Sequence, residues 1–305
     1  MMSSIKRGNN VSVIIVTYNS EKRISRCLNS VIKASPKIPE IIVIDNNSDD
    51  KTLKILKSFR GIKVKSNKIN VGFARAVNQA IRISRKSNHI LLLNPDTYIQ
   101  SDSIANLYRC LEKNHAHIAG GKTLKSKKQI YRSFVKTPTF WTVLFDYCNL
   151  RKICPGDYFH RVHYYLNEPF PRKDKLVDIV SGSFMLIKKE VFNEIGFFDE
   201  KFFMYLEDVD FCIRAMHANL KTIFCPHLTI FHEGGASSNN ADKIHYLAWS
   251  KSRKYYVKKY FNHPALSFLY MILIFDDAII NIWRKIKEFL KKTNPACYNQ
   301  NNVPS

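Results

Sequence analysis

The 305-residue sequence lacks the cysteine spacings that mark zinc sites and redox motifs. Its seven cysteines lie far apart along the chain, and no two of them form a C-x-x-C pair. An odd number of scattered cysteines is typical of reduced thiols in a cytosolic protein. We therefore predict neither a zinc site nor a disulfide framework.

Several enzyme classes are disfavoured by motifs that the sequence does not contain. No G-x-G-x-x-G follows the first apolar run and no G-x-x-x-x-G-K-[ST] occurs, which argues against a dinucleotide enzyme and a P-loop NTPase. There is also no G-x-S-x-G, and no cysteine adjoins a histidine. An enzyme nucleophile for covalent catalysis is therefore not evident.

Long hydrophobic runs are missing as well. The polar first ten residues precede a short apolar stretch, too short for the core of a signal peptide. No run approaches the ~18 apolar residues of a membrane span. We expect neither a signal peptide nor a membrane-spanning helix.

Acidic residues are scarce, since 25 Asp and Glu face 48 Lys and Arg and leave a net charge of +23. This charge favours a partner of opposite sign, such as nucleic acid, anionic lipid or the phosphates of a nucleotide or lipid. No RNP, zinc-finger or helix-turn-helix pattern accompanies the charge, which disfavours nucleic acid. Hydrophobic residues make up 45% of the chain, enough for the core of one large or two small domains.

The amino-terminal half alternates between short apolar runs and amphipathic segments. The runs at 11–16 and 41–44 are rich in branched apolar residues, as in strands buried on both faces, and shorter runs at 62–64 and 90–93 predict two further strands. The segments between them have helical spacing, at 21–34, 53–59 and 73–84. This alternation predicts an α/β fold with a parallel sheet and right-handed crossovers.

A polar cluster follows three of these predicted strands. Turns are polar in any protein, but ligands of such sheets bind beyond the carboxyl ends of the strands, and three clusters there favour a binding site. The candidate residues at the strand ends are Thr17, Tyr18 and Asn19, then Asp45 and Asn46, then Asn94 and Asp96.

The residue types in and near these clusters suit a nucleotide diphosphate. Asp45 can accept a hydrogen bond from the imide N–H of uracil or thymine. Gly72 lets the backbone approach a phosphate at the start of the predicted helix. Arg75 and Asn78 face the same way on that helix. Asp96 is a hard oxygen ligand that suits Mg²⁺ or Mn²⁺.

In the second half, a carboxylate pair, Glu207 and Asp208, opens a predicted helix and is flanked by aromatic residues. The helix terminus favours the ionised acids, whereas burial favours the neutral form, and an acid held between these influences can act as a general base. An N-capping role is the alternative, and this stretch alone leaves both open. His232 ends a predicted strand at 228–231 that follows another at 221–225, and we expect it to be functional.

The carboxy-terminal region is predicted to be helical and basic. An apolar run at 266–275 is interrupted by Asp276 and Asp277, and lysines and Trp283 follow. Such a segment suits a helix in the headgroup region of a membrane, and a helical hairpin packed on the domain is the alternative. Aromatic residues between 136 and 175 indicate a packed, partly helical lid, with core packing as the better explanation for most of the rings.

Six motifs, in this order along the chain, resemble those of family 2 inverting glycosyltransferases of the GT-A fold. Within that family they are most similar to the motifs of the rhamnosyltransferase-like members. The motifs, spread over residues 11–238, are VSVIIVTYNS, IIVIDNNSDD, NVGFARAVNQAI, LLLNPDT, SGSFMLIKKEVFNEIGFFDEKFFMYLEDVDFCIR and HEGGAS. The resemblance implies a mostly parallel, Rossmann-like sheet flanked by helices, with a carboxy-terminal helical extension.

The resemblance also implies a role for each candidate residue. Asp208 would be the catalytic base, with Glu207 beside it, and Asp96 and His232 would bind Mg²⁺ or Mn²⁺. Asn94 replaces the first carboxylate of the family's D-x-D motif, which narrows the subfamily and leaves one carboxylate to bind the metal. The residues that would bind the nucleotide sugar are Thr17, Tyr18, Asn19, Asp45, Asn46, Gly72, Arg75, Asn78 and Asn94.

The implied function is a single-displacement hexosyl transfer, with rhamnose from dTDP-rhamnose moving to a hydroxyl of a lipid-linked or surface-polysaccharide glycan. A UDP-galactofuranose or UDP-N-acetylglucosamine transferase is the alternative within the family. A nucleic-acid-binding protein and a non-catalytic relative are less favoured. We expect a cytoplasmic enzyme, peripheral on the inner face of a bacterial membrane. The expected organisation is a flexible start (1–10), a catalytic domain (11–240, with a donor half 11–121 and an acceptor half 122–240), a helical region (241–292) and a disordered tail (293–305).

Overall fold

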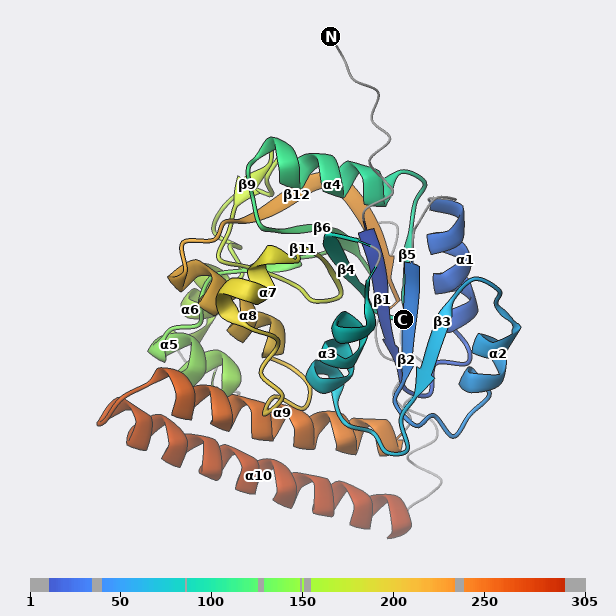
Figure 1. The fold of residues 1–305 in the computed structure, drawn as a ribbon. Helices are drawn as coiled ribbons and strands as arrows, with labels where there is room; N and C mark the ends of the chain where they lie inside the picture. Colours follow the sequence, from blue (N-terminus) through green and yellow to red (C-terminus); the bar gives the residue numbers. More distant parts are fainter. Residues whose placement is uncertain are drawn as a thin grey trace. The chain divides into compact units, whose positions relative to one another are not determined.

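The computed structural model describes residues 11–34, 40–85, 87–125, 129–148, 150, 155–233 and 239–293. The chain divides into two compact units. The first comprises Met1–Thr137 and Arg161–Ser252, and the second comprises Pro138–His160 and Arg253–Ser305. Each unit is described by itself below, with the element labels of Figure 1.

The first unit is built on a ten-stranded mixed sheet. Its main path runs β3-β2-β1-β4-β11-β6-β12-β5, with β7 paired to β6 and β9 paired to β12. A separate pair joins β8 (Phe134–Val135) to β10 (Ile179–Val180). The strands of the large sheet are β1 (Val11–Thr17), β2 (Glu40–Asp45), β3 (Lys63–Ser66), β4 (His89–Leu93), β5 (Thr97–Ile99), β6 (Ile118–Leu124), β7 (Ile130–Tyr131), β9 (Lys175–Leu176), β11 (Phe184–Lys188) and β12 (Thr222–His232).

Helices of the first unit lie between these strands in the sequence. They are α1 (Ile24–Ala34), α2 (Thr52–Ser58), α3 (Phe73–Ile83), α4 (Ser103–Lys113), α7 (Glu190–Ile195) and α8 (Glu207–His217). Three more elements lie wholly in the second unit, namely α5 (Phe140–Thr142), the π-helix η2 (Val143–Tyr147) and α10 (Ala265–Thr293). Helices α6 (Gly156–His163) and α9 (Asn239–Tyr260) run from one unit into the other.

The four parallel strands predicted from the sequence are confirmed. Strand β1 pairs in parallel with β2 and with β4, and β2 pairs in parallel with β3. Every residue of β1, β2 and β4 is buried, because helices cover both faces of the sheet. This explains why these strands are continuous apolar runs rather than alternating ones.

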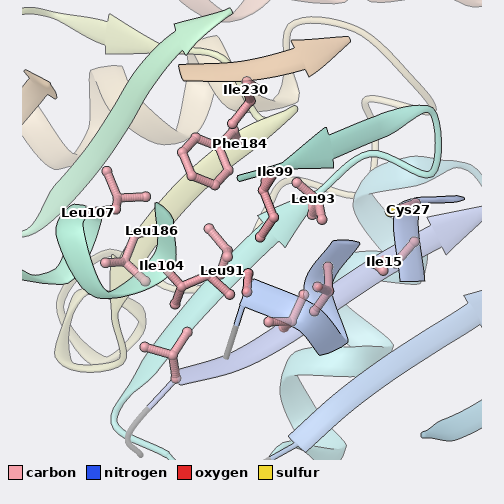
Figure 2. Packing of buried hydrophobic residues seen from close by; sticks show 14 of the residues in the cluster. Ile15, Cys27, Leu91, Leu93, Ile99, Ile104, Leu107, Phe184, Leu186 and Ile230 are labelled. Atoms are coloured by element: carbon pink, nitrogen blue, oxygen red, sulfur yellow. The ribbon is translucent and has the colours of Figure 1, made fainter. Parts of the chain in front are cut away.

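The two faces of β1 contribute to different packing layers. Val13 and Ile15 belong to one continuous core with residues of α1 and α4. Figure 2 shows Ile15 near Cys27 of α1, and Leu91 and Leu93 of β4 in the same layer. Helix α3 contacts β1 and β2 and supplies small buried residues, including Ala74 and Ala80. The parallel strands are therefore held between helices, and their carboxyl ends meet at one edge of the sheet.

Strand β11 enters this sheet in the opposite direction. It lies between β4 and β6 and is antiparallel to both, with Phe184 opposite Leu93. The start of β11 therefore lies at the same edge as the carboxyl end of β4. Residues 182 and 183, far along the sequence, are in this way brought next to the polar cluster that begins at Asn94.

The prediction of two short strands at 221–225 and 228–231 is wrong, because a single strand, β12, covers both. Its register against β6 shifts between Cys225 and Thr229. Pro226 lies in this shift, where the missing N–H of proline costs no hydrogen bond of the ladder. The strand continues beyond the irregularity and delivers His232 to the end of β12.

The expectation of reduced cysteines without a disulfide is also wrong, since Cys110 of α4 and Cys225 of β12 form a disulfide. The two residues are 115 positions apart, so no local spacing could indicate the pair. Among the described residues, Cys27, Cys148 and Cys212 are free and buried.

The second unit contains residues 138–160 of the aromatic segment 136–175, for which the sequence predicts a packed lid. The rings of Trp141, Phe145 and Phe159 stack on one another, with Trp141 and Phe159 centred 5.2 Å apart. These rings pack with each other, as the core-packing explanation proposes. Their placement over an acceptor stays a prediction.

The predicted helical character of this region holds for α10, which runs through Asp276 and Asp277 without a break. Both carboxylates pair with Arg253 of α9, and Lys254 lies 2.6 Å from Asp277. By length and composition alone, Ala265–Lys287 could cross a membrane, contrary to the expectation that no such segment exists. The sequence analysis missed this segment because the two acids divide its apolar run.

Candidate active site

The predicted site residues gather at the edge of the first unit where β1, β2 and β4 end. The register pairs Thr17 with Asp45, so the first two polar clusters are adjacent. The third cluster begins at Asn94, directly after β4. Its backbone N–H donates to the carbonyl of Ser183, which precedes β11.

Asp45 is the centre of a hydrogen-bond network at the end of β2. Its side chain is about 1% exposed and accepts hydrogen bonds from the hydroxyls of Thr17 (3.1 Å), Ser48 (2.6 Å) and Ser66 (3.3 Å). The Ser48 N–H donates to the same carboxylate at 3.2 Å. The carboxylate therefore fixes the loop after β2, and its contact with a nucleotide base stays a prediction.

Asn46 holds the loop that leads into α3. Its backbone N–H donates to the carbonyl of Thr17 at 2.8 Å. Its side-chain amide donates to the carbonyl of Gly72 at 3.1 Å and accepts from the side chain of Asn67 at 2.9 Å. Asn46 is buried, and its hydrogen bonds position the backbone of Gly72. Its contribution to a binding site would therefore be to hold this loop in place, not to contact a ligand directly.

Gly72 is at a close approach between two loops. Its φ is +86°, which favours glycine, and a Cβ there would lie 2.5 Å from the carbonyl oxygen of Phe203. The N–H of Phe73, the first residue of α3, donates to that same carbonyl at 2.6 Å. Gly72 thus joins the start of α3 to the turn that precedes Glu207.

Tyr18 and Asn19 lie in the loop after β1. Tyr18 is partly exposed, so its ring is open to stacking by a planar ligand. Asn19 has a positive φ of 50°, and its backbone N–H and side-chain oxygen bond to Ser48 and Asp49. Asn19 therefore ties the β1 loop to the β2 loop.

Arg75 and Asn78 of α3 face the same way, as predicted, but both contact the segment 198–200. Arg75 Nε lies 3.5 Å from Glu200. Asn78 is buried, donates to the Phe198 carbonyl at 2.8 Å and to Glu200 at 3.0 Å, and accepts from the Phe198 N–H. These contacts give Asn78 a structural role, and binding of sugar or diphosphate by either residue stays a prediction.

Asp96 and His232 are brought together by the pairing of β5 with β12. His232 lies opposite Thr97, and its Nε2 is 3.0 Å from Oδ1 of Asp96. The Glu233 N–H donates to the carbonyl of Asp96 at 3.1 Å, which secures the arrangement. A carboxylate and an imidazole side by side, both partly exposed, are a donor set that fits Mn²⁺ or Mg²⁺.

Glu233 was not predicted to take part in the site. Its carboxylate lies 2.5 Å from Arg26 and 3.4 Å from Arg23, and the Arg26 guanidinium stacks over Tyr98. It thereby anchors the end of β12 to the segment around α1. The only sequence signal was its place after His232. Gly234, Gly235 and Ser237, which follow His232 in the HEGGAS motif, lie outside the described residues.

Glu207 and Asp208 begin α8 after two residues with left-handed backbone, Tyr205 (φ 72°) and Leu206 (φ 66°). Consecutive non-glycine residues of this kind are strained and are often found at functional sites. Leu206 occupies the N-cap position of α8 and makes no side-chain cap hydrogen bond. Neither acid lies at the N-cap position, although Asp208 accepts a hydrogen bond from the first-turn N–H of Val209.

Asp208 is held by two backbone N–H groups. Its Oδ2 accepts from Gly182 at 2.8 Å and its Oδ1 from Val209 at 2.9 Å. Burial raises the pKa of Asp208 above its ordinary value, although these hydrogen bonds oppose the shift. Since Ser183 accepts from Asn94, a short chain of contacts links Asp208 to the cluster that contains Asp96.

Glu207 is about 7% exposed, and its Oε2 has no hydrogen-bond partner among the residues that the structure describes. Burial, together with the adjacent Asp208 charge, raises the pKa of Glu207 well above 4.5. The neighbouring turn is braced by α9, because the Tyr205 hydroxyl lies 2.7 Å from His245 Nδ1 and the Tyr205 ring meets Trp249 edge-on. The sequence did not indicate these α9 residues, which lie 40 positions or more downstream.

The raised pKa of Glu207 predicts a pH-dependent stability. The folded state holds a proton on Glu207 that the unfolded chain releases above pH 4.5, so this stability contribution is complete below that pH and is lost as pH rises toward the folded-state pKa. We expect Glu207→Gln to gain thermal stability relative to the wild type between pH 4.5 and pH 8. Unfolding temperatures across this range provide the measurement.

The matched control is Glu194→Gln, which changes an exposed glutamate on α7 in the same unit. Its unfolding temperature should follow the wild type at every pH. If Glu207→Gln shows the same pH profile as Glu194→Gln, then Glu207 is not held neutral by its surroundings.

The family model "Glycosyl transferase family 2" matches residues 12–196. The hexosyltransferase Agl10 of low-salt glycan biosynthesis from Haloferax volcanii is 29% identical over 73% of this chain and 66% of its own length. The N-acetylglucosaminyl-diphospho-decaprenol L-rhamnosyltransferase of Mycobacterium tuberculosis is 24% identical over 79% of this chain and 81% of its own. The dTDP-rhamnosyl transferase RfbF of Shigella flexneri is 25% identical over 93% of both chains.

Among solved structures, GalNAc-T7 with UDP, GalNAc and Mn²⁺ superimposes with a TM-score of 0.57 at 15% identity, covering 89% of this chain and 55% of that one. This likeness concerns the fold, which is GT-A. The expected α/β fold and the expected resemblance to rhamnosyltransferase-like enzymes are confirmed. The chain is a glycosyltransferase and belongs to glycosyl transferase family 2.

Proposed function

We propose that this enzyme transfers rhamnose from dTDP-rhamnose to a hydroxyl of a lipid-linked or surface-polysaccharide glycan, with inversion at the anomeric carbon. The observation that carries the proposal is Asp208. It is a half-buried carboxylate that is fixed by two backbone N–H groups, and burial raises its pKa above the ordinary value.

In this mechanism Asp208 accepts the proton of the acceptor hydroxyl as its oxygen attacks the anomeric carbon. The bond to the nucleotide diphosphate breaks on the opposite face, so no enzyme nucleophile is needed. Oδ1 and Oδ2 of Asp208 are oriented by Val209 and Gly182, which limits the directions from which a hydroxyl can approach. Orientation of this kind lowers the barrier by reducing the freedom lost on reaction.

Asp96 and His232 would hold a divalent ion on the donor side. When bound, Mg²⁺ or Mn²⁺ supplies positive charge that offsets the charge of the departing diphosphate. Two protein ligands leave room for phosphate oxygens and water, as these ions commonly require. Asn94 contributes its backbone to the contact with Ser183 and provides no charge.

The donor proposal is supported by relatives whose names include rhamnosyl transfer, and by the polar loops around Asp45. A donor with another hexose on UDP, such as galactofuranose or N-acetylglucosamine, is the second candidate. It is favoured by a structural neighbour that holds UDP. The decaprenol-linked acceptor in the name of one relative supports a lipid-linked acceptor here. We further propose a cytoplasmic location with peripheral membrane contact.

A thermal-shift panel tests the donor class. The nucleotides dTDP, UDP, GDP and ADP would each be added with Mn²⁺, Mg²⁺ or EDTA. A ligand at about 100 times its Kd stabilises the folded state by about 2.7 kcal/mol, so the specific nucleotide should produce a clear rise in unfolding temperature. We expect dTDP or UDP with metal to give the largest rise.

One variant and one control distinguish the effect of the metal on stability from the effect of the nucleotide. Asp96→Asn should lose the difference between metal and EDTA and keep a reduced response to dTDP or UDP. Glu194→Gln, far from the strand ends in sequence and exposed, should respond like the wild type. An equal response to all four nucleotides, or none to any, would contradict the proposed donor class.

A further inference from the structure

Helix α10 presents a continuous row of exposed apolar side chains. They recur every three or four residues and so lie on one face of the helix. Trp283 is 68% exposed and Phe275 is 61% exposed, values that are unusual for such large apolar side chains. The row comprises Phe268, Met271, Phe275, Ile279, Ile282, Trp283, Ile286, Phe289 and Leu290.

A different face of α10 is packed within the second unit. Leu269 and Leu273 are fully buried, and Asp277 is nearly so. Arg253 of α9, itself fully buried, pairs with Asp276 and Asp277, and Lys254 adds a second cation at Asp277. The helix is therefore fixed to the end of α9 through one face, while the apolar row lies elsewhere on its circumference.

Basic residues flank the apolar row in the last third of α10. At 100° per residue, Lys285 falls on one side of the row, and Arg284 and Lys287 fall on the other. Trp283 lies between them. Long basic side chains on both sides of an apolar stripe, with a tryptophan in it, suit the boundary between lipid headgroups and acyl chains.

The length of α10 would also allow it to cross a bilayer, but its charges argue against that orientation. A spanning helix would place Asp276 and Asp277 near the middle of the segment Ala265–Lys287. These acids are bound to cations of α9, so crossing would require either breaking those ion pairs or carrying α9 into the hydrocarbon. A helix lying in the membrane plane keeps the ion pairs intact.

We propose that α10 is an in-plane membrane-docking helix that inserts its apolar row into the interface of an anionic bilayer. The excess of basic over acidic residues in the chain complements such a surface, and the flanking cations reach its phosphates. The inference deepens the proposed function, since its biological use rests on a lipid-linked acceptor. The lipid contact itself involves only the second unit and needs neither donor nor acceptor.

Vesicle flotation of the full chain tests this inference without any nucleotide or glycan. We expect the protein to float with phosphatidylcholine vesicles that contain 30% phosphatidylglycerol. With vesicles of phosphatidylcholine alone, the fraction of protein that floats should be about tenfold lower. The variant Phe275→Ser/Ile279→Ser/Ile286→Ser should lose flotation while its circular dichroism spectrum stays unchanged. The matched control Ile69→Ser/Leu176→Ser removes exposed apolar side chains outside α10 and should float like the wild type.

The orientation has its own readout. The reporter must lie at the middle of the segment, so Phe275→Trp is introduced into a Trp283→Phe protein. Lipids brominated near the headgroup should quench the fluorescence that Phe275→Trp adds, and lipids brominated at the chain ends should not. Quenching only by the deep bromines, together with resistance to alkaline carbonate, would indicate a spanning helix and overturn the in-plane geometry. Equal flotation of the triple variant and the wild type would overturn the docking face.

A second copy of the chain could instead cover the apolar row. Sedimentation of the wild type as a dimer, and of the triple variant as a monomer, without flotation of either, would replace the lipid by that partner. Transfer to a short soluble acceptor, measured in parallel, distinguishes the two proposals. Activity without lipid binding sinks only the docking helix, and lipid binding without activity sinks only the proposed reaction.

Discussion

Replacement of Asp208 by Asn should lower kcat at least about 10²-fold, because the amide cannot accept the proton of the acceptor hydroxyl. The side chain keeps nearly the same size and can still accept from the Gly182 N–H, so the fold around α8 should survive. Steady-state transfer of the sugar from its nucleotide to an acceptor gives kcat. Nucleotide binding, followed by thermal shift, should stay unchanged, since Asp208 lies on the proposed acceptor side.

Two companion variants make the result specific. Glu194→Gln carries the same kind of change on the exposed face of α7 and should keep wild-type kcat. Glu207→Gln changes the acid next to Asp208 and tests whether the pair shares the proton. A fully active Asp208→Asn enzyme would exclude Asp208 as the base, and a variant that no longer binds nucleotide would indicate a structural role instead.

The largest expected effect on stability comes from Arg253→Met. Arg253 is fully buried and donates to Asp276, to Asp277 and to the carbonyl of Tyr147. Removing one partner of a buried ion cluster leaves uncompensated charge and costs about 3–5 kcal/mol. Urea unfolding followed by circular dichroism should show an earlier transition for the part of the chain that contains α10.

The neighbouring lysine provides the matched control. Lys254 pairs with Asp277 but is 27% exposed, so Lys254→Met should cost less than about 1 kcal/mol. The variant Arg253→Met/Asp276→Leu/Asp277→Leu removes the buried charges together and leaves the partly exposed Lys254 without its partner Asp277, so it should recover most of the lost stability. An Arg253→Met protein that unfolds at the wild-type urea concentration would show that the cluster contributes no net stability.

The parallel half of the sheet could be predicted from residues near one another in sequence. Strands such as 11–16 and 41–44 are β-branched runs buried on both faces, and the helices between them repeat apolar residues every three or four positions. Local composition is informative there because each element's own side chains decide its burial. The same reasoning located Thr17, Asp45 and Asn94 at the carboxyl ends of the strands.

Other features depended on contacts that local patterns do not encode. Cys110 pairs with Cys225 across 115 residues, and Asp276 is neutralised by a cation on another helix. In the sequence, Asp276 and Asp277 divide the apolar run of this helix, and an unpaired acid is unfavourable in apolar surroundings. Arg253 provides the opposite charge, so both acids are accommodated in the helix.

The candidate site divides in the same way. The sequence by itself determined the family, the fold class and the identity of the acid pair, since these follow from short motifs and from apolar periodicity. Only the tertiary structure decided that Gly182 holds Asp208, that His232 meets Asp96, and that Asn78 is occupied by the segment 198–200. The physical reason is that hydrogen bonds and ion pairs act over about 3 Å in space, and only the fold determines which distant residues come that close.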